Sequence, residues 1–214
     1  MAMQTWESIG SIAWVGLELL ATAAFALSGI VAAGRKHMDV VGACVVGFLS
    51  AFGGGTLRDL LIDRRPFFWV EHQSVLVGVL ALCVLGVTFM RRRHIDLTEK
   101  AILWPDALGL GLFCASGLHL AASHGMPALV AIMMGVVTGA FGGVLRDMVC
   151  NEVPALLKDH RPYALCAFAG GCAYMTLQWA GAASLSCALA CIGLTTGLRA
   201  LALLRDWRLP SWHD

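Results

Sequence analysis

The sequence predicts an all-α integral membrane protein with seven membrane-spanning helices, arranged as two inverted three-helix repeats and one further helix. The composition supports a membrane environment, because 58% of the 214 residues are hydrophobic, 14% are charged and the mean hydropathy is +0.76. The chain also repeats itself at a spacing of 88 residues. These two observations together predict the fold class.

Seven segments have the length and apolar character of a membrane-spanning helix, which needs roughly 20 mostly apolar residues. They are 9–33, 40–62, 74–90, 102–123, 126–150, 163–180 and 185–204. The short connections predict one membrane domain over residues 1–214. We divide it into a first repeat (9–90), a second repeat (102–180) and a seventh helix (185–204).

The repeat aligns without a gap, and its best match places residues 54–59 on residues 142–147. Other equivalent pairs are Glu18 with Asp106, Ser28 with Ser116, Gly47 with Gly135, and Pro66 with Pro154. Because each copy holds three segments, the second enters the membrane from the opposite side. Inverted repeats of this kind are typical of transport proteins with a site near the membrane midplane.

The distribution of cations predicts the orientation, because Lys and Arg are retained on the cytoplasmic side during insertion. Only Arg64 and Arg65 lie on one side of the predicted bundle. The other side carries Arg35, Lys36, Arg91, Arg92, Arg93, Lys100, Lys158, Arg161, Arg205 and Arg208. The N-terminus is therefore expected outside and the C-terminus in the cytoplasm. Arg91–Arg93 also suit contact with anionic membrane lipid.

Glycines interrupt the second and fifth predicted helices, at Gly53, Gly54 and Gly55 and at Gly142 and Gly143. Each Gly lowers helix stability by about 1 kcal/mol relative to Ala, so a kink or unwound turn is expected. Such a turn exposes carbonyl groups to a cation and amide groups to an anion. The alternative is structural, because small residues at every fourth position let membrane helices pack closely.

A charged pair follows each glycine run within an apolar helix, where an ionised side chain costs at least roughly 2.5 kcal/mol near the membrane centre. Duplication of these pairs favours a functional interpretation of both the charges and the glycines. We predict two ion-pair clusters, consisting of Glu18, Arg58 and Asp59 on the outer side and Asp106, Arg146 and Asp147 on the inner side.

Ser28-Gly29 and Ser116-Gly117 interrupt the first and fourth predicted helices at equivalent positions. Both serines are candidates to line a path, although a serine in a membrane helix also bonds its own backbone. The eight cysteines include no C-x-x-C pair, so we expect packing residues and no metal or other cofactor. The sequence contains no basic stripe interleaved with aromatic residues, so no nucleic-acid partner is expected.

The FGGGTLRD and FGGVLRD motifs, the Ser-Gly pairs and the three-plus-three-plus-one layout resemble the trimeric intracellular cation (TRIC) channels. The resemblance is closer to their bacterial and archaeal branch, some of whose members are described as glycine transporters, and runs from about Trp14 to Leu204. It implies a homotrimer in the inner membrane of a prokaryote, with one pore per subunit. The implied pore lies along the second and fifth helices, kinked at residues 53–55 and 142–143, and conducts monovalent cations, chiefly potassium.

The resemblance places Arg58, Asp59, Arg146 and Asp147 near this path. The chain departs from the family pattern at Phe141, which replaces the first glycine of the second motif and predicts a milder inner kink. The Lys-Glu-Val tripeptide of the animal members is also absent. We therefore do not transfer their calcium and lipid regulation.

Two function classes remain open. The first is a channel, in which carbonyl groups at the glycines partly replace the hydration shell of potassium. The second is a carrier for glycine or a similar small zwitterion, with alternating access between the inverted halves. An enzyme is not expected, because the sequence has no G-x-S-x-G or H-E-x-x-H motif.

Overall fold

The structure is a computed structural model that describes the backbone of residues 2–89, 99–158 and 160–210, and side chains within 12–89, 102–158 and 160–210. The described residues form α-helices and include no β-strand. Arg91, Arg92 and Arg93, which are part of the orientation argument, lie outside this described part, as does the side chain of Lys100.

The helices follow the predicted segments closely. They are α1 (Ala2–Arg35), α2 (Val40–Leu61), α3 (Phe68–Glu71), α4 (Gln73–Phe89), α6 (Glu99–Ser123), α7 (Ala128–Val149), α8 (Ala155–Lys158), α9 (Ala164–Trp179) and α10 (Ser184–Leu204). Asp39 caps the start of α2, where its carboxylate accepts a hydrogen bond of 2.8 Å from the backbone N–H of Gly42.

Five helices among the described residues are long and apolar enough to cross a membrane, so the predicted count of seven spans is not confirmed. The candidates are Ile12–Arg35, Val40–Leu61, Ile102–Ser123, Ala128–Val149 and Ser184–Leu204. The third helix of each predicted repeat is shorter, with 17 residues in α4 and 16 in α9. At 1.5 Å per residue, such helices reach about 24–26 Å, which is less than the hydrocarbon thickness of about 30 Å.

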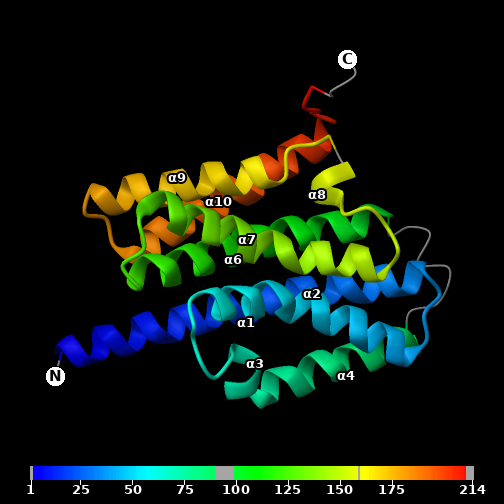
Figure 1. Ribbon diagram of the computed structural model, residues 1–214. Helices are drawn as coiled ribbons and strands as arrows, with labels where there is room; N and C mark the ends of the chain where they lie inside the picture. The colour runs from blue at the N-terminus through cyan, green and yellow to red at the C-terminus, as the bar shows by residue number, and fades with distance from the viewer. Residues whose placement is uncertain (1, 90–98, 159, 211–214) are drawn as a thin grey trace.

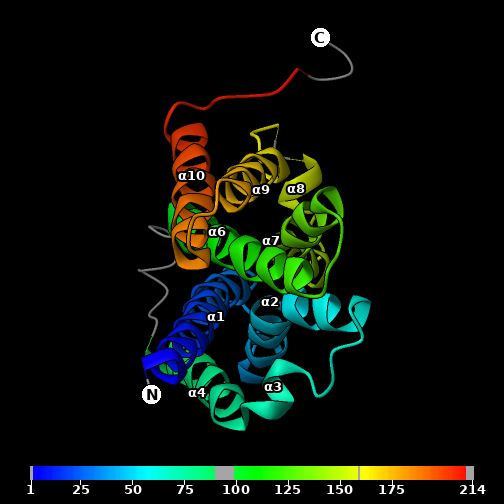
Figure 2. The same ribbon diagram turned by 90° about the vertical axis from the view of Figure 1, so that its left-hand side faces the viewer.

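The helices form a bundle in which α6 and α7 lie centrally (Figure 1). On one side α1, α2 and α4 pack together, and on the other side α9 packs against α10 (Figure 2). The first group contacts the central helices where α1 packs on α6 and α2 packs on α7, and the second where α10 packs on α6 and α9 packs on α7. These central contacts bring residues of the same motif, 88 positions apart, next to each other.

The glycine runs produce close helix packing and not the unwound turns expected from the sequence. Both α2 and α7 are assigned as continuous helices through their glycines. A Cβ on Gly54 would collide with the carbonyl oxygen of Thr138, and a Cβ on Gly142 would collide with that of Ser50. Ser50 and Thr138 are themselves 88 residues apart. The two helices therefore cross backbone to backbone at one pair of glycines.

The Ser-Gly pairs also lie within continuous helices, so the predicted interruptions of α1 and α6 are absent. A Cβ on Gly29 would lie 2.7 Å from Ser50 Oγ and 2.9 Å from the Cα of Gly47 on α2. A Cβ on Gly117 would collide with the side chain of Thr138 on α7. These glycines allow the first two helices of each repeat, α1 with α2 and α6 with α7, to approach each other.

We predict that Gly54→Ala lowers the melting temperature of the purified protein in detergent. Overpacking of this kind costs about 1–3 kcal/mol, and the carbonyl of Thr138 is backbone that cannot turn away. Gly55→Ala is the matched control, because its Cβ would meet nothing closer than 3.9 Å, and helix propensity alone favours Ala by about 1 kcal/mol. Equal melting temperatures of the two variants would contradict the close crossing.

Candidate functional site

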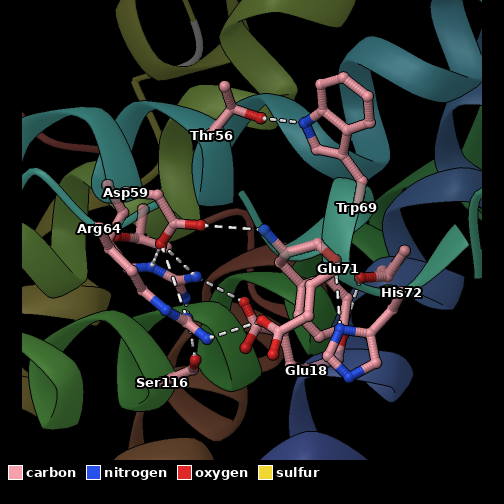
Figure 3. A network of polar contacts seen from close by, with 12 residues as sticks. Glu18, Thr56, Asp59, Arg64, Trp69, Glu71, His72 and Ser116 are labelled. Atoms are coloured by element: carbon pink, nitrogen blue, oxygen red, sulfur yellow. Dashed lines mark hydrogen bonds and ion pairs between the residues drawn. The ribbon is translucent and has the colours of Figure 1, made fainter. Parts of the chain in front are cut away.

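The outer cluster is built around Arg58, whose side chain is fully buried near the C-terminal end of α2. Its Nη2 donates to Glu18 Oε1 at 2.6 Å, and its Nε donates to Asp59 Oδ1 at 2.8 Å. Its Nη1 donates to Ser116 Oγ at 3.2 Å. Figure 3 shows Glu18, Asp59 and Ser116 converging on this guanidinium from three different helices.

The segment after α2 covers the end of the outer cluster. The backbone N–H of Phe68, at the start of α3, donates to Asp59 Oδ2 at 3.3 Å. Arg64 lies between two carboxylates, 3.9 Å from Asp59 Oδ1 and 3.6 Å from Glu71 Oε2 (Figure 3). Both oxygens of Asp59 therefore have partners.

The inner cluster repeats this arrangement at the C-terminal end of α7. Arg146 Nε donates to Asp147 Oδ1 at 2.8 Å, and Arg146 Nη1 donates to Asp106 Oδ1 at 2.7 Å and to Ser28 Oγ. The backbone N–H of Ala155, at the start of α8, donates to Asp147 Oδ2 at 2.8 Å. Each contact of Arg58 with a carboxylate or a serine thus has its equivalent in the second cluster.

The two serines connect the clusters across the repeat. Ser116 belongs to the second copy but binds the arginine of the first, and Ser28 belongs to the first copy but binds the arginine of the second. Ser50 and Thr138 behave differently, because each hydroxyl donates to a carbonyl of its own helix. This exchange of partners fixes α2 against α6 and α7 against α1.

Both arginines are paired as burial requires. A buried guanidinium without a partner costs several kcal/mol, whereas a paired one with satisfied hydrogen bonds approximately offsets its desolvation. Two carboxylates contact each guanidinium, and the side chains of all eight cluster residues are buried. The ion-pair clusters that the sequence predicts are thus present, with the two serines as further members.

The remaining glycines of the motifs differ in what they face. A Cβ on Gly53 would collide with the flexible side chain of Leu145. A Cβ on Gly55 would make ordinary van der Waals contacts of 3.9 Å with Arg58 and Glu18, and a Cβ on Gly143 would lie 3.4 Å from Asp106 Oδ1. Gly54 and Gly142 are therefore the crossing positions, while Gly55 and Gly143 leave room beside the clusters.

The described structure places two further polar residues at the inner cluster that the sequence analysis does not include. Arg199, which is 1% exposed on α10, lies with its guanidinium 4.8 Å from the centre of the Tyr163 ring. Its Nη1 donates to the carbonyl of Pro162 at 3.2 Å. A cation within the seventh apolar segment was a sequence signal for Arg199, but Tyr163 had none.

A cavity of about 350 Å³ opens beside the inner cluster and includes Arg146 and Asp147 in its wall. Lys36 Nζ and Glu152 Oε1 pair at 2.7 Å in the same wall and join the turn after α1 to the turn after α7. The hydrogen bond from Lys36 lowers the pKa of Glu152. The bridge is therefore present at neutral pH and is lost as the pH falls through this lowered pKa.

The described residues include no group of three or more His, Cys, Asp or Glu side chains placed to hold a metal ion. The clusters are instead sites where carboxylate, hydroxyl and guanidinium groups line a narrow region between helices. This chemistry suits the passage or binding of a small polar solute.

We predict that Arg58→Met destabilises the protein by about 3–5 kcal/mol, because two buried carboxylates lose their partner. Lys36→Met is the control, since its exposed bridge to Glu152 contributes about 0–1 kcal/mol. Thermal unfolding in detergent measures both. Ser116→Ala provides a milder variant, with an expected loss of about 1.5–3 kcal/mol for a hydrogen bond to a charged group. Losses no larger than that of Lys36→Met in both cluster variants would contradict this account.

Comparison with known proteins gives consistent matches. The family model described as "Glycine transporter" matches residues 15–92 and 103–179. The UPF0126 inner membrane protein YadS of Escherichia coli is 34% identical, over 92% of this chain and 91% of its own length. A UPF0126 membrane protein of Vibrio cholerae is 33% identical, over 92% of this chain and 81% of its own length. With the five candidate spans, these relatives place the chain in a bacterial inner membrane.

Solved structures confirm the resemblance to the TRIC channels. The TRIC trimeric intracellular cation channel orthologue from Rhodobacter sphaeroides superposes with a TM-score of 0.82 at 32% identity, covering 91% of this chain and 99% of that one. A second TRIC cation channel structure gives a TM-score of 0.81 at 31% identity, covering 91% of this chain and 95% of that one. These structural neighbours are ion channels and not enzymes. The chain has the TRIC channel fold and belongs to the family described as "Glycine transporter".

Proposed function

We propose that this protein is a monovalent cation channel that prefers potassium, with one path in each subunit of a homotrimer. The observation that carries the proposal is the likeness to TRIC cation channel structures over nearly the whole chain, with TM-scores of 0.82 and 0.81. In this proposed channel, each subunit consists of the inverted repeats 9–90 and 102–180 and a separate helix at 185–204. Its N-terminus lies outside and its C-terminus in the cytoplasm.

The proposed path runs between the two repeats and passes both arginine clusters. In each cluster two carboxylates neutralise the guanidinium that they contact, so the arginine does not repel an approaching cation. Ser28 and Ser116, together with the space beside Gly55 and Gly143, supply polar surface at the two ends. The cavity next to Arg146 is the proposed inner entrance.

The crossing of α2 and α7 separates the outer cluster from the inner one in this structure. Gly54 and Gly142 bring the two backbones together there, and they leave no room for an ion at the point of contact. Conduction then requires α2 and α7 to move apart at this crossing. In this proposal the contact between Gly54 and Gly142 closes the path when the helices touch and opens it when they separate. Gly53 packs at the edge of this contact.

The family description as a glycine transporter supports the second candidate, a carrier for glycine or a similar zwitterion. In a carrier, an arginine would bind the substrate carboxylate and an aspartate its ammonium group. The existing pairing opposes this, because each guanidinium is already engaged by two carboxylates and a serine. The channel is therefore the better-supported function.

Purified protein in planar bilayers and liposomes distinguishes the two functions. A channel is expected to give discrete single-channel steps that reverse near the potassium equilibrium potential in a potassium gradient. Such currents should not saturate at millimolar solute. Electrically silent bilayers combined with saturable glycine uptake into liposomes would contradict the proposal and establish the carrier.

A further inference from the structure

The hydroxyl group of Tyr163 is buried next to the carboxylate of Asp106 but makes no hydrogen bond of good geometry with the described residues. The residue is 5% exposed and immediately precedes α9, and its oxygen faces the inner cluster beside Asp106. A buried hydroxyl that makes no hydrogen bond is destabilising, and ordered water is a common partner for such groups. The Tyr163 hydroxyl is therefore expected to form a hydrogen bond with a bound ligand.

The space for this ligand lies over Gly143. The point where a Cβ would stand on Gly143 is 3.4 Å from both Tyr163 Oη and Asp106 Oδ1, and 3.7 Å from Arg146 Nη2. A cavity of about 10 Å³ lies between these helices, with Gly143, Arg146, Asp147 and Tyr163 in its wall. Its volume is roughly what one water molecule needs.

The surrounding charges select a neutral ligand. Arg146 and Arg199 supply two positive charges, and Asp106 and Asp147 supply two negative ones. Arg146 in the cavity wall is ion-paired with both Asp106 and Asp147, so neither a cation nor an anion would find an unpaired counter-charge there. A zwitterion such as glycine balances the charges but exceeds a cavity sized for one water.

We infer that the inner cluster binds one water molecule, held between Tyr163 Oη, Asp106 Oδ1 and Arg146 Nη2. The water donates to the carboxylate and accepts from the guanidinium and the phenol. Three polar partners are typical of a buried water. The inference goes beyond the proposed channel function and does not depend on it.

The outer cluster has no equivalent of this site. His72 precedes α4 as Tyr163 precedes α9, but its Nδ1 already pairs with the carbonyl of Phe68 at 3.2 Å. The corresponding small cavity has four aromatic residues in its wall, and its polar side chains, Glu18, Thr22 and Thr56, all have hydrogen-bond partners within the protein. The water site thus makes the two halves of the molecule chemically unequal, and α10 contributes to the difference through Arg199.

The test is the effect of Tyr163→Phe on the melting temperature of the full-length protein, measured in three backgrounds. In the wild-type background the loss of a water-bound hydroxyl should lower the melting temperature by about 2–4 °C. In the Gly143→Ala background the methyl group occupies the place of the water, so Tyr163→Phe should leave the melting temperature unchanged or raise it. In the Gly55→Ala background, at the equivalent outer position, the wild-type loss should persist.

Two outcomes would overturn the inference. No decrease on Tyr163→Phe in the wild-type background would show that the hydroxyl has no bound partner. An equal decrease in all three backgrounds would show that the hydroxyl bonds the protein directly, without water. A high-resolution crystal structure provides the independent check, since water density within hydrogen-bond distance of Tyr163 Oη is expected in the wild type and not in Gly143→Ala.

Discussion

The burial of two guanidinium groups among apolar helices is the constraint on which the rest of this structure depends. Each guanidinium requires several hydrogen-bond acceptors, and these come from α1, α2 and α6 for Arg58 and from α1, α6 and α7 for Arg146. The four long central helices are thereby fixed relative to one another. The short helices α3 and α8 are positioned by the same clusters. The first backbone N–H of α3 donates a hydrogen bond to Asp59, and that of α8 donates one to Asp147.

The crossing of α2 and α7 is the second consequence of the duplicated motif. Arg58 and Arg146 lie one turn beyond Gly54 and Gly142, so holding both arginines in place brings the two glycine positions together. Any larger residue at these positions would separate the helices and disturb both clusters. Packing and charge pairing are thus coupled, and a movement at the crossing is expected to alter the surroundings of both arginines.

The sequence predicts the clusters well because their members repeat at one spacing and carry charges that cannot stay unpaired in a membrane. It does not predict that Ser28 and Ser116 exchange partners between repeats, because that depends on how the repeats pack in space. The sequence was consistent with a kink or unwound turn at the glycines and with close helix packing, and the structure shows close packing without an unwound turn. The predicted count of seven spans is not confirmed, because α4 and α9, with 17 and 16 residues, are shorter than the five candidate spans although they lie where the sequence predicts the third helix of each repeat. Tyr163 left no signal, since nothing in the sequence indicates that its hydroxyl faces Asp106.

The central claim is that both clusters lie along one path that water and ions reach from opposite sides. Ser28→Cys and Ser116→Cys test it most directly, in a background whose eight native cysteines are replaced. A charged, membrane-impermeant thiol reagent is added to one side at a time during single-channel recording. The account predicts that current falls for Ser116→Cys with outer reagent only, and for Ser28→Cys with inner reagent only. Unchanged current after chemically verified modification of both positions would contradict it.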